Sequence, residues 1–326
     1  MVTILNDWKK HCAVLLTAGC ALIGLYSGGA QAASDGGMRG PDICAKTSQL
    51  QFKACHHEAR DDAQVESAMC LNLGDIQARE DCMNASQTAR LETVKQCGAI
   101  RQARNEICTK LGMGGAYNPV IDPANFVTGI NNRFTPFPKG AFRVYEKTTA
   151  DGVERIRVEL LPETRVIMGV TVTTLRDTVT LDGVVIEDTK DWIAQDKDGN
   201  VWYFGEIVQN FEDGLLANLD GSFEAGKDGA KAGFWSKAAP IVGETYRQEW
   251  ALGNAEDIVE VVSLNATDTV VPFSAFGTGT VLKTKDTTPM SPGVVEFKYY
   301  VPGIGFALEV KPATGERLEL IDYGPK

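Results

Sequence analysis

The fold of the longer part of this chain is decided by residues 166–193, which read VIMGVTVTTLRDTVTLDGVVIEDTKDWI. Apolar and polar side chains alternate over residues 166–181 and again over residues 184–193, as they do in half-buried β-strands. The dipeptide Asp182-Gly183 between the two runs is a strong signal for a tight β-hairpin turn. This stretch therefore predicts two antiparallel strands joined by a short turn.

The same pattern extends over residues 141–326. A second turn signal, Asp151-Gly152, separates the runs 142–148 and 153–161. Further strands are predicted at 201–204, 215–224, 245–252, 257–264, 269–275, 279–285, 294–301, 304–311 and 316–323. About a dozen strands with short turns predict a large antiparallel β domain. We expect a curved sheet, half-barrel or barrel, with a sandwich as the alternative.

A second, cysteine-rich segment covers residues 41–112. It contains Cys44, Cys55, Cys70, Cys82, Cys97 and Cys108, at intervals of 11, 15, 12, 15 and 11. Proline is absent from 42 to 118, and Ala, Gln, Arg and Glu are frequent, which predicts helices. We interpret Cys44, Cys70 and Cys97 as the starts of three degenerate helical units.

Two cysteines that are 11 residues apart lie about 16 Å apart along a helix, which is too far for one disulfide. Each cysteine must therefore reach a neighbouring helix, and an even number of cysteines in an exported chain indicates disulfides. We predict three disulfides, with the pairing left open. The segment resembles helical hairpins of exported or intermembrane-space proteins that are built on paired C-x(n)-C helices. That resemblance implies a module that binds or spaces.

The N-terminal residues have the pattern of an export signal. Lys9 and Lys10 precede an apolar run at 13–26, and Ala30-Gln31-Ala32 offers a cleavage site. We predict a signal peptide at 1–32 and a flexible segment at 33–40. The helical module then covers 41–112, a Pro- and Gly-rich linker that packs on the next domain covers 113–140, and the β domain covers 141–326. The alternatives are an uncleaved membrane anchor and a lipoprotein signal that would lipidate Cys20.

Composition excludes several classes of protein. The 326 residues include 32 Lys and Arg against 43 Asp and Glu, a formal net charge of −11. With 44% hydrophobic and 23% charged residues, the chain is neither a multi-span membrane protein nor a disordered one. Nucleic-acid binding needs a basic surface, so we expect no nucleic-acid partner. The excess of acid lies in 113–326, with 31 acidic and 20 basic residues, whereas 41–112 has 10 and 9.

Six phrases stand out within residues 120–312. They are DPANF (122–126), DWIAQDKDGNVWYFGE (191–206), GSFEAG (221–226), DGA (228–230), YRQE (246–249) and AED (255–257). Through these phrases, residues 120–312 resemble an uncharacterised family of exported bacterial β-rich proteins. The resemblance implies a bacterial exported protein with one β domain. It implies no catalytic residue.

The β domain lacks the residues of most hydrolytic sites. No histidine follows His57 and no cysteine follows Cys108, which excludes Ser-His-Asp and Cys-His nucleophiles and a histidine-bound zinc in that domain. The catalytic option that remains is a carboxylate pair, as in glycoside hydrolases. The candidates for such a pair are Asp196, Glu206, Glu224, Asp228, Glu249, Glu256 and Asp257.

Two segments have metal-ligating residue types. We interpret residues 55–58 (CHHE) as helix surface, because adjacent helical side chains diverge by about 100°. Asp196-Lys197-Asp198-Gly199-Asn200 matches part of a calcium loop, but Val201 stands where such a loop needs Gly. We interpret it as a hairpin turn, and we predict no metal and no cofactor.

Three functions fit these observations. The first is an exported, non-enzymatic binding or envelope-associated protein, periplasmic or extracellular, that offers an aromatic cavity or surface to an apolar ligand, a glycan or an envelope protein. The residues predicted to bind are Trp192, Trp202, Tyr203, Phe204, Glu206, Arg247 and Trp250. The alternatives are a carboxylate-based hydrolase of polysaccharide and a protein-interaction module that uses the helical repeats. We expect no transmembrane segment in the mature chain.

Overall fold

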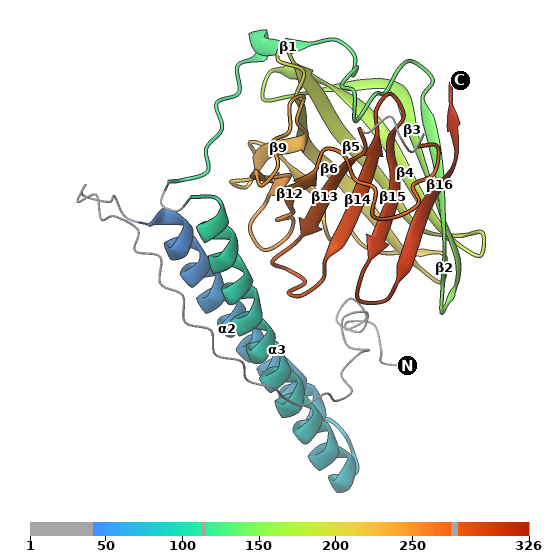
Figure 1. Ribbon diagram of the computed structural model, residues 1–326. Coiled ribbons are helices and arrows are strands. Elements are labelled where there is room, and N and C mark those ends of the chain that lie inside the picture. Colours follow the sequence, from blue (N-terminus) through green and yellow to red (C-terminus); the bar gives the residue numbers. More distant parts are fainter. Residues whose placement is uncertain (1–41, 113–114, 275–279, 326) are drawn as a thin grey trace, which may run out of the picture. The chain divides into compact units, whose positions relative to one another are not determined.

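The structure is a computed structural model that describes residues 42–112, 115–274 and 280–325 (Figure 1). The predicted signal peptide (1–32), the alternative lipidation site at Cys20 and the predicted flexible segment at 33–40 lie outside these residues. The described chain is α+β, as predicted. Two N-terminal helices joined by disulfides precede a large antiparallel sheet that is nearly closed and barrel-shaped.

The helices are α2 (Ile43–Cys70) and α3 (Ile76–Lys110), which run antiparallel as a hairpin. Each begins after an aspartate whose side chain accepts a hydrogen bond from a free backbone amide of the first turn. Asp42 accepts from the Ala45 amide at 2.9 Å, and Asp75 accepts from the Ala78 amide at 2.8 Å. These caps fix where both helices start.

Three disulfides join the two helices, as predicted. The bridges are Cys44–Cys108, Cys55–Cys97 and Cys70–Cys82. The predicted division into three units is wrong, because α3 continues without a break through Cys97. The cysteine intervals read the same in both directions because successive bridges are 11 and 15 residues apart on both of the antiparallel helices, on either side of a single turn.

Small side chains fill the interface between α2 and α3. Ala59 is 2% exposed. The hydroxyl of Ser48 donates to the Arg101 carbonyl at 3.3 Å, and the hydroxyl of Ser86 donates to the Ala63 carbonyl at 3.2 Å. Such an interface buries little apolar surface, so covalent bridges have to supply much of the hairpin's stability.

The β domain contains sixteen strands in the described residues, all paired antiparallel. They are β1 (Phe126–Val127), β2 (Phe142–Thr149), β3 (Gly152–Ile167), β4 (Val170–Leu181), β5 (Val184–Asp196), β6 (Val201–Glu212), β7 (Leu215–Asn218), β8 (Phe223–Glu224), β9 (Lys231–Ser236), β10 (Thr245–Arg247), β11 (Glu249–Trp250), β12 (Ile258–Ser263), β13 (Leu282–Thr287), β14 (Glu296–Val301), β15 (Gly305–Lys311) and β16 (Glu316–Gly324). A short 3-10 helix, Pro123–Asn125, precedes β1.

The order across the sheet is β10-β12-β13-β14-β15-β16-β2-β3-β4-β5-β6-β9-β11, while β1 pairs with β5 and both β7 and β8 pair with β6. The hairpin at Asp182-Gly183 forms as predicted between β4 and β5. The predicted single strand 166–181 is instead divided by a tight turn at Met168-Gly169. Both turns place two successive residues at positive φ, which suits the right-handed twist of the flanking strands. Residues 269–274 form a loop rather than the predicted strand.

Residues 245–250 bring the two edges of the sheet together. Strand β10 pairs with β12 at one edge, and β11 pairs with β9 at the other. The two strands are separated only by Gln248, whose amide donates to the Asp257 carbonyl at 2.8 Å. A Cβ atom at Gly233 in β9 would collide with the carbonyl oxygen of Gln248, so glycine permits the close approach there. The architecture is therefore a nearly closed barrel rather than the alternative sandwich.

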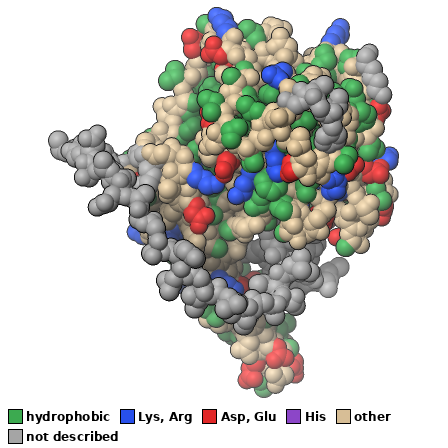
Figure 2. Space-filling view, viewed as in Figure 1, with side chains coloured by type: hydrophobic (Ala, Val, Ile, Leu, Met, Phe, Trp, Pro, Cys, Tyr) green, Lys and Arg blue, Asp and Glu red, His purple; other side chains and the backbone are tan. Residues whose placement is uncertain are grey.

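The segment before β2 contributes to the core. Ile130 and Phe137 are buried with Leu175, Ile193 and Tyr203 of strands β4, β5 and β6. On the face shown in Figure 2, acidic and basic side chains are interspersed. Many of the charged side chains pair with each other across neighbouring strands.

Candidate functional site

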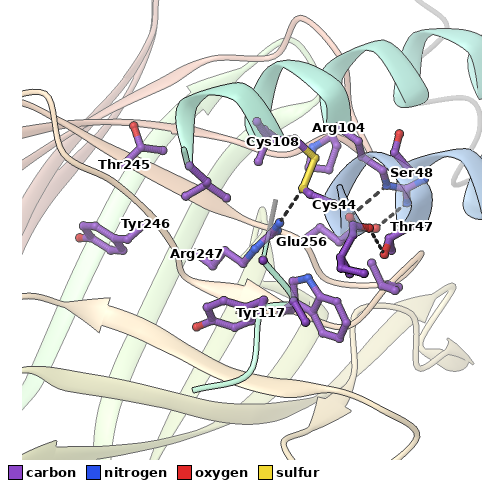
Figure 3. Close-up of a pocket in the computed structure, with 18 of the residues that line it drawn as sticks. Cys44, Thr47, Ser48, Arg104, Cys108, Tyr117, Thr245, Tyr246, Arg247 and Glu256 are labelled. Carbon is purple, nitrogen blue, oxygen red and sulfur yellow. Dashed lines mark hydrogen bonds and ion pairs between the residues drawn. A yellow bond between two sulfur atoms is a disulfide. The ribbon is translucent and has the colours of Figure 1, made fainter. Parts of the chain in front are cut away.

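A pocket of about 490 Å³ lies between the helical hairpin and strands β10 and β11 (Figure 3). This volume falls within the range of about 300–1,000 Å³ that is typical of small-ligand sites. Apolar side chains and the Cys44–Cys108 disulfide form much of its wall. The largest apolar contributors are Ile43, Ile107, Leu111, Tyr117, Phe234, Tyr246, Trp250 and Leu252.

A buried ion pair holds the hairpin against the β domain at this pocket. Arg104 of α3 donates to Glu256 through Nε at 3.0 Å and through Nη2. The two side chains are 9% and 3% exposed. Glu256 also accepts the amide of Gly253 at 2.8 Å. Both carboxylate oxygens of Glu256 are therefore already bonded.

The second cation of the pocket is Arg247, at the end of β10. Its Nη2 donates to the Cys44 sulfur at 3.8 Å, and its guanidinium lies 5.5 Å from the centre of the Tyr117 ring. Burial lowers the pKa of Arg247 from its usual value, and the negative charge of Glu256 opposes that shift. No carboxylate in the described part of the chain forms an ion pair with Arg247.

The charges of the Arg, Asp and Glu side chains that line the pocket do not cancel. Arg104 and Arg247 supply two positive charges, and Glu256 supplies one negative charge. Because Glu256 is held by Arg104, the unbalanced charge lies at Arg247. A local net charge of +1 contrasts with the overall charge of −11.

Aromatic side chains stand next to this charge. The ring centres of Tyr117 and Trp250 are 6.1 Å apart. The Tyr117 hydroxyl donates to the Ala232 carbonyl of β9 at 2.8 Å, which fixes the orientation of the ring. Burial raises the pKa of Tyr117 to about 12, so it stays neutral. The pocket thus combines a rigid aromatic wall with one unpaired cation.

A separate group of carboxyls, buried at Asp191 and half-buried at the other members, lies in the sheet. Asp191 of β5 faces Glu206 of β6 in the strand register, and the Tyr203 hydroxyl donates to Asp191 at 2.5 Å. Burial raises the pKa of Asp191 to about 7 and that of Asp257 to about 6. Burial and neighbouring negative charges also raise the pKa values of Glu206 and Glu249 well above their usual range.

Two of the seven residues predicted to bind line the pocket, and five lie elsewhere in the β domain. Arg247 and Trp250 line the pocket. The other five do not line it: Trp192 and Phe204 are buried in an apolar cluster, Trp202 packs against that cluster, Tyr203 belongs to another cluster, and Glu206 lies among the carboxyls of the sheet. Tyr117, Arg104 and the start of α2 also line the pocket, although none of them was predicted to bind.

Of the seven carboxylates predicted as hydrolase candidates, three lie together in the sheet and four do not belong to that group. Asp196 accepts hydrogen bonds from the amide and side chain of Asn200, at 2.8 and 3.0 Å, as a hairpin turn requires. Glu224 pairs with Arg165, and Glu256 pairs with Arg104. Glu206, Glu249 and Asp257 interact electrostatically within the sheet. Of the seven candidates, only Glu256 lines the pocket.

No set of three or more His, Cys, Asp or Glu residues in the described ranges is arranged to hold a metal ion. In the CHHE segment, Cys55 forms a disulfide, and the ring of His56 packs against that of Phe52 with the ring centres 4.3 Å apart and the planes tilted by 60°. Neither of the two described helices has the length and apolar character needed to cross a membrane.

Comparison of the chain with protein-family models, with curated proteins and with solved structures finds no match. The assignment of function therefore depends on the geometry of the pocket.

Proposed function

We propose that this protein is an exported, non-enzymatic binding protein that takes a small apolar ligand into the pocket between the hairpin and the β domain. The proposal rests on the pocket of about 490 Å³ and on the contacts that fix its walls. A hydrogen bond orients the Tyr117 ring, and the Arg104–Glu256 ion pair holds α3 against the β domain. Fixed apolar walls with a few placed polar groups are typical of small-molecule sites.

Three disulfides in the helical hairpin support export, because such bonds persist in oxidising compartments. A periplasmic or extracellular location, as the N-terminal pattern and the resemblance to exported β-rich proteins suggest, belongs to the same proposal. The hairpin then serves the function that its own resemblance implies, since it supplies one wall of the binding site.

The hydrolase alternative finds less support at this pocket. Glycoside hydrolysis uses two carboxyl groups on either side of the scissile bond. The lining of the pocket includes one carboxylate, Glu256, and both of its oxygens are bonded to Arg104. The lining residues thus lack the acid and base pair that this reaction needs.

Titration with N-phenyl-1-naphthylamine, a neutral apolar dye that fluoresces when it leaves water, tests the proposal. Thr47→Trp places a large side chain at the pocket wall on α2. Thr88→Trp is the matched control, because Thr88 makes the same intrahelical hydrogen bond at 2.8 Å on an exposed part of α3. We expect saturable binding to the wild type and to Thr88→Trp, and at least tenfold weaker binding to Thr47→Trp. Equal binding to all three proteins would place the dye elsewhere and refute the proposal.

A further inference from the structure

We infer that the ligand carries a single carboxylate, which pairs with the Arg247 guanidinium while its apolar body packs against Tyr117 and Trp250. This inference rests on the proposed binding function and specifies the chemical class of the ligand. The pocket would then select amphipathic monocarboxylates, such as medium-chain fatty acids, over neutral molecules of the same size.

The hydrogen-bonding capacity of Arg247 supports this inference. A guanidinium has five N–H donors in a planar fork that matches the two oxygens of a carboxylate. Among the described residues, the Arg247 side chain donates a hydrogen bond only to the weakly accepting sulfur of Cys44, at 3.8 Å. Figure 3 shows the Arg247 side chain extending toward Cys44, beside Tyr117 and Glu256. Its remaining donors are thus available to a ligand.

The neighbouring carboxylate of Glu256 does not pair with the Arg247 guanidinium. Glu256 faces Arg104, which holds both of its oxygens, and it also accepts the Gly253 amide. A cation that is largely removed from water needs an anionic partner to offset the loss of hydration. One negative charge on the ligand would neutralise the pocket, whereas a phosphate monoester would bring an excess of negative charge.

The position of the charge also agrees with an amphipathic ligand. Arg247 lies at the end of β10, and Trp250 lies three residues further along the chain in β11, on the same pocket. Tyr117 lies next to both, 6.1 Å from Trp250 between ring centres and 5.5 Å from the Arg247 guanidinium. A carboxylate bound at Arg247 would therefore have aromatic surface within reach of its first carbon atoms.

Displacement of the neutral dye by three ligands of equal chain length tests the inference on the wild-type protein. The ligands are decanoate, 1-decanol and decyl phosphate. We expect decanoate to displace the dye at roughly 30-fold lower concentration than decanol, because losing one partner of a desolvated charge pair costs about 2 kcal/mol or more. Equal potency of decanoate and decanol, or tighter binding of decyl phosphate than of decanoate, would overturn the inference.

The variant Arg247→Met keeps an apolar stem of similar length and removes the charge. Relative to the dye affinity of the variant itself, we expect decanoate and decanol to displace the dye at similar concentrations, so that the preference for decanoate is lost. Arg155→Met, which removes an exposed arginine paired with Glu146 on the far strands β2 and β3, should keep the preference. A preference that survives in Arg247→Met would also refute the inference. If no protein binds the dye, the proposed function fails; if the dye binds without a headgroup preference, only this inference fails.

Discussion

Raising the pH from 5 to 8 should destabilise the β domain, and Asp191 should contribute much of the loss. Asp191 is 6% exposed and accepts a hydrogen bond from Tyr203 at 2.5 Å. Burial, reinforced by the negative charge of Glu187, raises the pKa of Asp191 from 3.8 to about 7, although the Tyr203 hydrogen bond opposes the shift. The folded protein therefore binds this proton more tightly than the unfolded chain does.

The sign and size of the effect follow from proton linkage. The stabilisation from protonated Asp191 is complete below the unfolded pKa, near 4, and is lost as the pH rises through about 7. Each pH unit in this window corresponds to about 1.36 kcal/mol, so the loss between pH 5 and pH 8 is roughly 3 kcal/mol. The same direction applies to Asp257 and Glu309, whose pKa values burial raises to about 6 and about 7.

The variant Asp191→Asn isolates this contribution, because Asn has the shape of a protonated Asp and cannot ionise. Urea unfolding followed by tryptophan fluorescence, with the disulfides intact, gives the free energy of unfolding at each pH. We expect the difference between variant and wild type to shift by roughly 3 kcal/mol in favour of the variant from pH 5 to pH 8. The control Asp228→Asn, at an exposed turn, should show no such shift. A difference that stays constant with pH, or shifts the other way, would refute the reasoning.

Three further predictions concern the interfaces. Glu256→Gln leaves the Arg104 guanidinium without its carboxylate, so urea unfolding should show a loss of about 3 kcal/mol; a loss below 1 kcal/mol would contradict a buried ion pair. Replacing Cys55 and Cys97 together by Ser should cost about 2–4 kcal/mol, measured by far-UV circular dichroism of the helices, and an unchanged unfolding midpoint would argue against the bridge. Gly233→Ala introduces a collision with the neighbouring backbone and should lower stability by about 1–3 kcal/mol or more, which thermal unfolding can test against the wild type.

Much of the fold could be predicted because local signals and tertiary structure agree. The Asp182-Gly183 turn and the alternation around it are local properties, and they identify β4 and β5 correctly. Met168-Gly169 was missed because Met is not a typical residue for positive φ, and only the pairing of β3 with β4 forces it there. The cysteine intervals were interpreted as a tandem repeat, although their symmetry about the middle interval also fits an antiparallel hairpin.

The pocket could be predicted only in part. Arg247 and Trp250 were among the residues predicted to bind, but an uninterrupted strand over 245–252 would put two residues that are three apart on opposite faces. They line the same pocket because β10 ends at Arg247 and β11 begins at Glu249, so the alternation is interrupted at Gln248. The absence of an ion-pair partner for Arg247 in the described structure depends on Arg104, which lies on α3 and holds Glu256. Arg104 and Glu256 are 152 residues apart in the sequence, and an ion pair over that distance leaves no local pattern from which it could be predicted.

Native mass spectrometry of the protein purified from its native source, without detergent, tests the central claim most directly. We expect the wild type to carry a bound small molecule that dissociates as a monocarboxylate, and we expect Thr47→Trp prepared in the same way to lack it, whereas Thr88→Trp retains it. A wild-type protein without any bound species, or a species retained equally by Thr47→Trp, would contradict the account.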